Sequence, residues 1–307
     1  MVAVGVFMST LDGSIVNIAL PAIMADLRAP LTTVEWVMLI YLLTISSLLL
    51  SFGRLSDIRG RRWVYTRGLI VFSAGSLFCG LAREAGWLIA ARAFQGLGAA
   101  MIMSCTQAIV VEAFPASERG RAMGMIGAVV ASGLTVGPAL GGFILHVFNW
   151  QTIFYINIPI GILTAIAAAV LLRGSPSDKK RPERFDLAGA FLLALSTGTF
   201  LYVVTHGYKD GYASPTILVL AGVAVLSAAG LVWNEFHVDH PIISPSLLKI
   251  RLFTLPVAAA MILFAGLFTI VFMMPFYLMH PRGFSENQAG YLMVDRKSTR
   301  LNSSHYS

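Results

Sequence analysis

The run GWLIAARAFQGLGAAMIMSCTQAIVV at positions 86–111 indicates the fold class, because its 26 residues contain one charged side chain, Arg92. About 20 mostly apolar residues are enough for a helix to cross the hydrocarbon core of a bilayer. The run is too long for a strand and does not alternate between apolar and polar residues. Similar runs recur along the chain and predict an all-α, polytopic membrane protein with nine spans, at 1–25, 34–53, 64–82, 86–111, 121–146, 152–172, 187–206, 215–234 and 253–279.

A tenth apolar run begins near Gln288 and stops after a few residues. The last 13 residues, DRKSTRLNSSHYS at 295–307, are mostly charged or hydroxylated and resemble a translated library-adapter sequence. We therefore expect 295–307 to be a non-native tail. We also expect the native sequence to continue beyond Val294, so that the chain is truncated at its C-terminus.

The composition argues against several classes of protein. Of the 307 residues, 57% are hydrophobic and 12% are charged, whereas about 25% are charged in a typical soluble domain. A soluble enzyme, a nucleic-acid-binding protein and a disordered chain are therefore disfavoured. The net charge of +7 alone would suit a protein that binds nucleic acid. The positions of the basic residues must therefore distinguish a nucleic-acid-binding protein from a membrane protein.

Most of the basic residues fall on one side of the predicted membrane. If the first span runs outward, 14 Lys and Arg residues lie in or beside the cytoplasmic connections and 4 lie on the external side. Cytoplasmic loops carry an excess of Lys and Arg. The bias predicts a multi-pass protein of the cell (inner) membrane with no nucleic-acid partner. The predicted cytoplasmic loops are 54–63, 112–121, 173–186 and 235–252.

The longest polar stretch, RGSPSDKKRPERF at 173–185, contains two prolines and five basic residues. It predicts a cytoplasmic linker that separates an N-terminal six-helix bundle, residues 1–172, from the helices that follow. The two cysteines, Cys79 and Cys105, lie in apolar runs and match no metal-binding motif. We therefore expect no metal site.

The most specific motif is GRLSDIRGRR at 53–62, between the second and third spans. Its two glycines are expected to allow a tight reversal, and its aspartate can pair with the neighbouring arginines. A generic basic loop is the alternative. The motif resembles the one between helices 2 and 3 of the major facilitator superfamily, where it is read as a conformational latch between two halves. On this resemblance the latch residues are Gly53, Asp57, Gly60, Arg61 and Arg62.

The fourth span contains RAFQGLGAA at 92–100. An arginine within a lipid-embedded helix is unfavourable, so it is expected to face the bundle interior. Helical spacing places Gln95, Gly96 and Ala99 on the same face as Arg92. Snorkelling towards the membrane surface is the alternative. The stretch also resembles the helix-4 motif of the superfamily, in which the arginine is associated with proton coupling.

The first span contains LDGSIVNIALP at 11–21, and Asp12 interrupts its apolar run. A charged aspartate there costs about 2.5–3.5 kcal/mol on insertion scales, which makes Asp12 a candidate for proton coupling or substrate recognition. A structural aspartate permanently paired to a basic group is the alternative. The stretch resembles the helix-1 signature of fourteen-helix drug:proton antiporters, and WQTIFYINIPIG at 150–161 resembles the same branch.

The fifth span contains GLTVGPALGG at 133–142, in which three glycines four residues apart form one stripe. The proline at its centre is expected to kink the helix. Ordinary packing of small residues is the alternative. The combination resembles the motif that marks the antiporters of the superfamily. On this resemblance the packing residues are Gly133, Gly137, Pro138, Gly141 and Gly142.

Over residues 1–294 the chain therefore resembles the fourteen-helix drug:proton antiporter branch of the major facilitator superfamily. The resemblance implies that 186–234 is an extra helix pair and that 235–294 begins the second bundle. It also implies a proton-coupled antiporter that exports drugs or other amphipathic, often cationic, compounds across the cytoplasmic membrane. Its partners would be a small-molecule substrate, protons and the lipid bilayer, without any cofactor.

Two alternatives to a drug exporter remain open. One is a dedicated metabolite exporter of the same fold, and the other is a non-transporting truncated relic. The sequence contains no phosphate-binding loop and no plausible Ser/His/Asp or Cys/His set. We therefore expect no enzymatic activity.

Overall fold

The computed structural model describes residues 1–172, 186–238, 241–242, 247 and 249–279. The predicted linker 173–185, the tenth run near Gln288 and the tail 295–307 lie outside the described residues. All long regular elements within the described part are α-helices, as predicted. The chain divides into two compact units, Met1–Ile243 and Ser244–Ser307.

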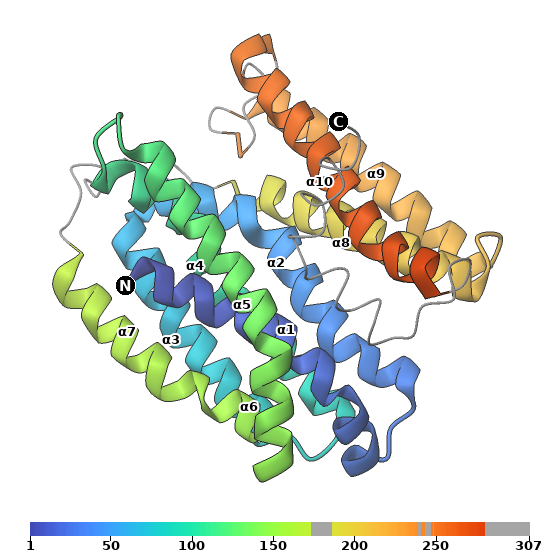
Figure 1. Cartoon of the computed structure of the whole chain (residues 1–307). Coiled ribbons are helices and arrows are strands. Elements are labelled where there is room, and N and C mark those ends of the chain that lie inside the picture. Colours follow the sequence, from blue (N-terminus) through green and yellow to red (C-terminus); the bar gives the residue numbers. More distant parts are fainter. Residues whose placement is uncertain (173–185, 239–240, 243–246, 248, 280–307) are drawn as a thin grey trace, which may run out of the picture. The chain divides into compact units, whose positions relative to one another are not determined.

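The first unit contains nine of the helices (Figure 1). They are α1 (Val2–Leu27), α2 (Leu31–Arg59), α3 (Arg61–Gly80), α4 (Ala85–Ala113), α5 (Arg119–Val147), α6 (Thr152–Tyr155), α7 (Asn157–Leu171), α8 (Leu187–Asp210) and α9 (Pro215–His237). The second unit contains α10 (Arg251–Met279), which covers the predicted run at 253–279.

Seven helices of the described part are long and apolar enough to cross a membrane, so the chain is an integral membrane protein. They are α1, α2, α4, α5, the consecutive α6 and α7, α8 and α9. The predicted run at 64–82 forms α3, which is not among the seven. Arginine, glycine and serine occupy much of its length. It lies against α4 and α7, so its smaller residues serve helix packing.

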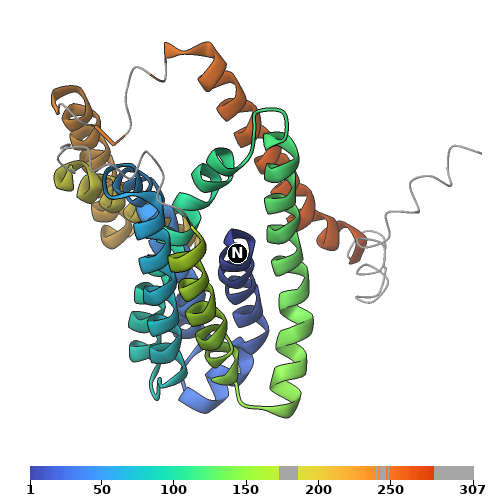
Figure 2. The same cartoon turned by 90° about the vertical axis from the view of Figure 1, so that its left-hand side faces the viewer.

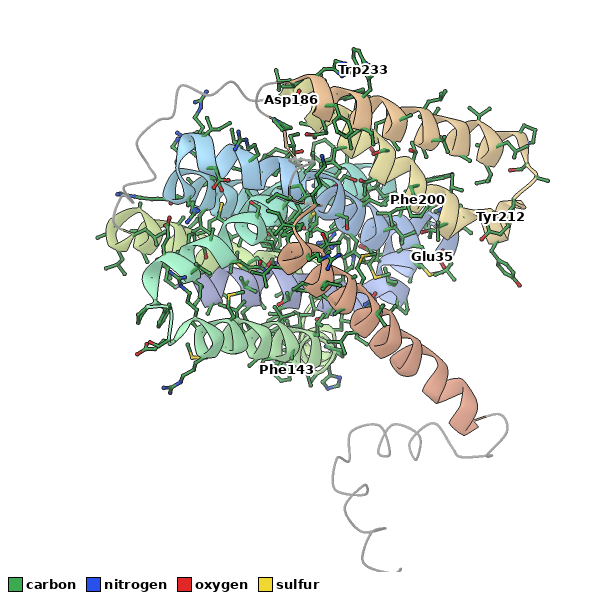
Figure 3. The ribbon with its side chains drawn as sticks, turned by 90° about the horizontal axis from the view of Figure 1, so that it is seen from above. Glu35, Phe143, Asp186, Phe200, Tyr212 and Trp233 are labelled. Carbon is green, nitrogen blue, oxygen red and sulfur yellow. The ribbon has the colours of Figure 1, made fainter. Side chains whose placement is uncertain are left out.

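Within the first unit, α1 contacts α2, α4, α5 and α7, and α3 packs against α4 and α7. Figure 2 shows α1 between α5 and α7. Buried apolar side chains form one cluster that includes Ile23 and Leu88 and another that includes Leu69 and Ile102. Many outward side chains are also apolar, such as Phe143 on α5, which is 63% exposed (Figure 3). This distribution suits a bundle whose outer surface faces lipid.

Helices α8 and α9 pack against each other, and α8 also contacts α2. Asp186 caps α8 by accepting a hydrogen bond from the Gly189 N–H at 2.8 Å, and it accepts a second from Asn234 Nδ2 of α9 at 2.6 Å. Figure 3 shows Asp186 and Trp233 at one end of this pair and Tyr212 at the other. One aspartate therefore both starts α8 and joins it to the end of α9.

The predicted loop 54–63 is almost entirely helical. α2 continues to Arg59 and α3 begins at Arg61, so only Gly60 forms the turn, with φ 97° and ψ 135°. Gly53 lies within α2, and a Cβ added to it would meet no atom within 4 Å. The expectation that Gly53 assists the reversal is therefore wrong. Likewise, α4 extends to Ala113 and α5 begins at Arg119, which shortens the predicted loop 112–121.

The predicted span 152–172 is interrupted at Ile156, between α6 and α7. Pro159 explains the interruption, because it has no N–H with which to bond the carbonyl of Tyr155. Asn157 consequently begins α7 and is 2% exposed. The break places a buried amide at the level of the bundle interior.

Candidate functional site

Asp12 of α1 and Arg92 of α4 form an ion pair inside the first unit. Arg92 Nη1 lies 2.5 Å from Asp12 Oδ2, and both side chains are 0% exposed. Arg92 therefore does not snorkel towards the membrane surface. For Asp12, the structure contains the pairing with a basic group that the sequence left as an alternative, and the partner is Arg92.

Two side-chain amides complete the surroundings of the Asp12 carboxylate. Its Oδ1 atom accepts hydrogen bonds from Gln95 Nε2 at 3.0 Å and from Asn157 Nδ2 at 2.7 Å. Gln95 also accepts a hydrogen bond from Arg92 Nη1 at 2.7 Å and donates one to Ser76 Oγ at 2.8 Å. Side chains from α1, α3, α4 and α7 thus meet in one polar network.

The guanidinium of Arg92 has further partners on α2. Its Nε donates to the carbonyl of Val37 at 3.0 Å, and its Cζ lies 4.0 Å from the centre of the Tyr41 ring. The Phe154 ring lies 5.7 Å away. In contrast, Arg92 Nη2 is buried without a hydrogen-bond partner among the described residues. The network therefore fixes the position of the Arg92 guanidinium and leaves its Nη2 atom free to donate to another acceptor.

Sequence reasoning found Asp12, Arg92 and Gln95 but missed Asn157 and Tyr41. The available signal for Asn157 was an amide within the apolar stretch YINIPIG, because polar groups inside a membrane seek partners. Tyr41 gave no such signal, since a tyrosine is common in an apolar run.

The glycine stripe of α5 faces α1. A Cβ added to Gly133 would lie 2.3 Å from Thr10 Oγ1, and one added to Gly137 would lie 2.9 Å from Ser14 Cβ. Ser14 Oγ also donates a hydrogen bond to the Gly133 carbonyl at 3.0 Å. A Cβ added to Gly141 would meet Ile15 at 2.9 Å. The three glycines thus permit close approach of the two helices.

The other two residues of that motif lie elsewhere on α5. Pro138 is within the helix and exposed, and Gly142 is exposed with no atom within 4 Å of an added Cβ. The sequence grouped all five residues, whereas the structure brings only the glycines at the four-residue spacing into contact with α1.

The residues around Gly60 form a second charged cluster, at the end of the bundle. Arg61 Nη2 lies 3.5 Å from Asp57 Oδ1, and Arg61 Nη1 pairs with Glu112 of α4. Arg61 Nη1 also donates to the Ala108 carbonyl at 3.2 Å. These contacts bring the α2–α3 turn and the end of α4 to the same end of the bundle. Glu112 was missed, although it directly follows the apolar run 86–111.

Arg62 turns away from this cluster. Its Nη2 donates a hydrogen bond to the carbonyl of Ala169, near the end of α7. The two consecutive arginines of the motif therefore join α3 to two different helices. Gly53 takes part in neither set of side-chain contacts.

No group of three or more His, Cys, Asp or Glu side chains that could hold a metal ion occurs within the described ranges. Cys79 and Cys105 are both free thiols and buried. The polar interior consists instead of an ion pair with amide and hydroxyl partners.

A bundle of helices that are long and apolar enough to cross a membrane, with a buried ion pair inside it, defines a polytopic membrane protein. Residues 2–294 match the Major Facilitator Superfamily, and the chain belongs to it. Its relatives include proteins named as transporters, which agrees with the expectation that the chain does not belong to an enzyme family.

Several relatives of the chain are named as transporters or as multidrug resistance proteins. The chain is 36% identical to the riboflavin transporter RibZ of Clostridioides difficile (strain 630), over 96% of this chain and 63% of RibZ. It is 33% identical to the multidrug transporter MdtP of Bacillus subtilis (strain 168), over 95% of this chain and 53% of MdtP. It is 34% identical to the putative multidrug resistance protein MdtD of Yersinia pestis (strain Pestoides F), over 96% of this chain and 63% of MdtD.

The chain thus spans between about half and two thirds of the length of these relatives. Among solved structures, the human organic anion transporter MFSD10 has the same fold, with a TM-score of 0.51 at 16% identity. That similarity covers 76% of this chain and 60% of the human transporter.

Proposed function

We propose that the chain acts in proton-coupled antiport, exporting drugs or other amphipathic, often cationic, compounds across the cytoplasmic membrane. The observation that carries the proposal is the fully buried Asp12–Arg92 pair with its Gln95 and Asn157 partners. The multidrug transporters among the relatives support the substrate class.

The Asp12 carboxylate is the group through which we propose protons and substrate to be exchanged. While Arg92 lies against it, the guanidinium occupies the Asp12 carboxylate. When the two separate, the carboxylate becomes available to another cation. A proton and a cationic substrate would then compete for the same carboxylate, which is the requirement for antiport.

Arg92 and the helices around it would convert this exchange into movement. A protonated Asp12 leaves the Arg92 guanidinium with its Val37, Gln95 and Tyr41 partners but without a counter-charge. An uncompensated buried charge is strongly unfavourable. We propose that α1 and α4 shift in response and expose the site to the other side of the membrane, as alternating access requires.

We assign the remaining motifs to support of this cycle. Gly53, Asp57, Gly60, Arg61 and Arg62 are proposed as the latch, and Gly133, Gly137, Pro138, Gly141 and Gly142 as the antiporter packing motif. The contact between Arg61 and Glu112 supports a latch role for the α2–α3 turn, since it is charged and close to the bundle end. We further propose the fourteen-helix branch, with α8 and α9 as its extra pair.

The proposed location is the cell membrane, with the α2–α3 and α4–α5 connections on the cytoplasmic side. The excess of Lys and Arg near these connections supports this orientation. Their common position at one end of the bundle agrees with it, because Arg61 of one contacts Glu112 beside the other.

The test is proton-driven efflux of a cationic dye from cells that lack other exporters and express the protein from its gene. Asp12→Asn should abolish efflux while membrane insertion is unchanged. Asn17→Ala is the matched control, because Asn17 is a polar residue of the same helix that is exposed. Unchanged dye efflux in Asp12→Asn would remove Asp12 from the mechanism.

A dedicated metabolite transporter is the second candidate, favoured by the 36% identity to a riboflavin transporter. The two functions are separated by competition experiments in the same cells. Inhibition of dye transport by many unrelated cations supports a multidrug exporter. Transport of riboflavin that excess dye does not inhibit would favour the dedicated transporter.

A further inference from the structure

A basic cavity lies beside the α2–α3 turn and does not include Arg61 among its lining residues. It has a volume of about 360 Å³ and is lined by Arg59 of α2, by Arg62, Trp63, Thr66 and Arg67 of α3, and by Ala169 of α7. Three of its six lining residues are arginines, and all three are exposed. The cavity therefore concentrates positive charge where α2 and α3 reach the end of the bundle.

These arginines differ from Arg61 in lacking acidic partners. Arg61 is paired with Asp57 and Glu112. Within the described residues, neither Arg59, Arg62 nor Arg67 forms an ion pair with a carboxylate. Such a site attracts anions more strongly than a surface on which the two signs of charge alternate.

One of the lining residues, Thr66, has an unpaired hydroxyl. Thr66 Oγ1 is buried and has no hydrogen-bond partner among the described residues. A buried hydroxyl usually bonds an acceptor, so its lack of a partner is unfavourable unless a ligand or water supplies one. Phosphate oxygens accept hydrogen bonds from arginine guanidinium groups and from hydroxyl groups.

The rim of the cavity is suited to a membrane surface. Trp63 is 41% exposed, and the Cζ atom of Arg67 lies 5.2 Å from the centre of its ring. Tryptophan is enriched at the boundary between lipid headgroups and hydrocarbon. Basic pockets between transmembrane helices at this level bind the headgroups of anionic lipids.

We propose that this cavity binds the phosphate group of an anionic phospholipid, with the arginine side chains and the Thr66 hydroxyl as donors. The lipid would sit beside the Arg61 cluster and hold the end of α2, the start of α3 and the end of α7 together. Placing the lipid in the cytoplasmic leaflet rests on the orientation proposed above, whereas the binding itself does not.

The experiment measures lipids retained by the purified 307-residue chain in native mass spectrometry after exchange in micelles that contain equal phosphatidylglycerol and phosphatidylcholine. The chain is expected to retain phosphatidylglycerol selectively. Arg59→Gln with Arg67→Gln should lower its retention about 25-fold, since each basic residue near an anionic surface contributes about fivefold. Millimolar inorganic phosphate is expected not to displace the lipid.

The matched control is Arg119→Gln with Arg121→Gln, which removes two arginines from the start of α5, outside the cavity. Thr66→Val is a milder variant that keeps the side-chain shape and should still weaken phosphatidylglycerol retention. Helical circular dichroism must be unchanged in every variant.

Three results would overturn the proposal. Equal loss in the control pair would indicate general surface charge, and equal retention of phosphatidylcholine would show that anionic charge is not recognised. Displacement by millimolar phosphate would assign the cavity to a soluble phosphate compound instead of a lipid.

Discussion

Among the described residues, arginine pairs with carboxylate both in the interior and at the bundle end, and these two sites differ in their contact with water. In the interior, Arg92 and Asp12 are each 0% exposed. At the bundle end, the Arg61 side chain is 20% exposed, and its partners Asp57 and Glu112 are 50% and 36% exposed. The same chemical pairing therefore has different energetic consequences.

Burial explains the difference. When one partner of a buried pair is removed, the other charge stays in an apolar environment and cannot be solvated. At the exposed cluster, water and salt replace a lost partner at little cost. The interior pair is thus suited to coupling protonation to structure, and the exposed cluster is suited to opening and closing repeatedly.

The largest expected effect is that of Arg92→Gln, which leaves the Asp12 carboxylate without its cation. We expect the free energy of unfolding to fall by about 3–5 kcal/mol. Denaturant unfolding of the detergent-solubilised chain, followed by far-UV circular dichroism, measures it. The double variant Asp12→Asn with Arg92→Gln should recover part of the loss. A double variant as unstable as the sum of the single variants would show that the two side chains are not coupled.

The second-largest loss of stability is expected at the contact between α1 and α5. Gly137→Leu should destabilise the chain by about 3 kcal/mol, because the new side chain collides with Ser14 and the backbone of Ile15. The control is Gly142→Leu on the same helix, where an added Cβ meets nothing within 4 Å. Equal melting temperatures for the two variants would mean that α5 does not pack on α1 through Gly137.

At the bundle end, substituting the turn residue Gly60 should lower the free energy of unfolding more than removing one of the charges. Gly60→Ala places a side chain at φ 97°, which we expect to cost about 1–3 kcal/mol. Gly53→Ala, within the last two turns of α2, should be neutral or stabilising, because alanine favours a helix more than glycine does. The melting temperatures of the two variants, measured by thermal unfolding, test this difference. A greater loss for Gly53→Ala would contradict the placement of the turn at Gly60.

The smallest expected effect is that of Glu112→Gln, which removes one partner of Arg61. Because the pair is partly exposed, we expect a loss of about 0.2–1 kcal/mol that decreases as salt is added. Unfolding at low and high ionic strength measures it. A loss as large as that of Arg92→Gln would erase the contrast between the two arginine sites.

The sequence predicted the helical class and most spans well, because a bilayer demands long apolar runs with few charges. It was less successful where a charged stretch remained helical. Arg54 and Arg59 are compatible with a helix, so α2 continues through a segment that polarity alone assigns to a loop. Gly53 was misplaced for the same reason.

Within the site, the sequence marked residues singly but did not pair them. Asp12 and Arg92 each stand out because a charge inside an apolar run is unfavourable. They are 80 positions apart, and helical periodicity carries no information about which faces of two helices meet. Asn157 was missed because its burial depends on the packing of α7 against α3 and α1, which the sequence of α7 alone does not show.

The sequence by itself determined that this protein spans a membrane with helices, because the lengths and charges of its apolar runs suit no other environment. It also determined which residues are costly enough there to need partners. Only the tertiary structure decided those partners: Arg92 for Asp12, Glu112 for Arg61 and α1 for the glycines of α5. The reason is physical, since membrane insertion depends on each segment alone, whereas pairing depends on the packing of several helices at once.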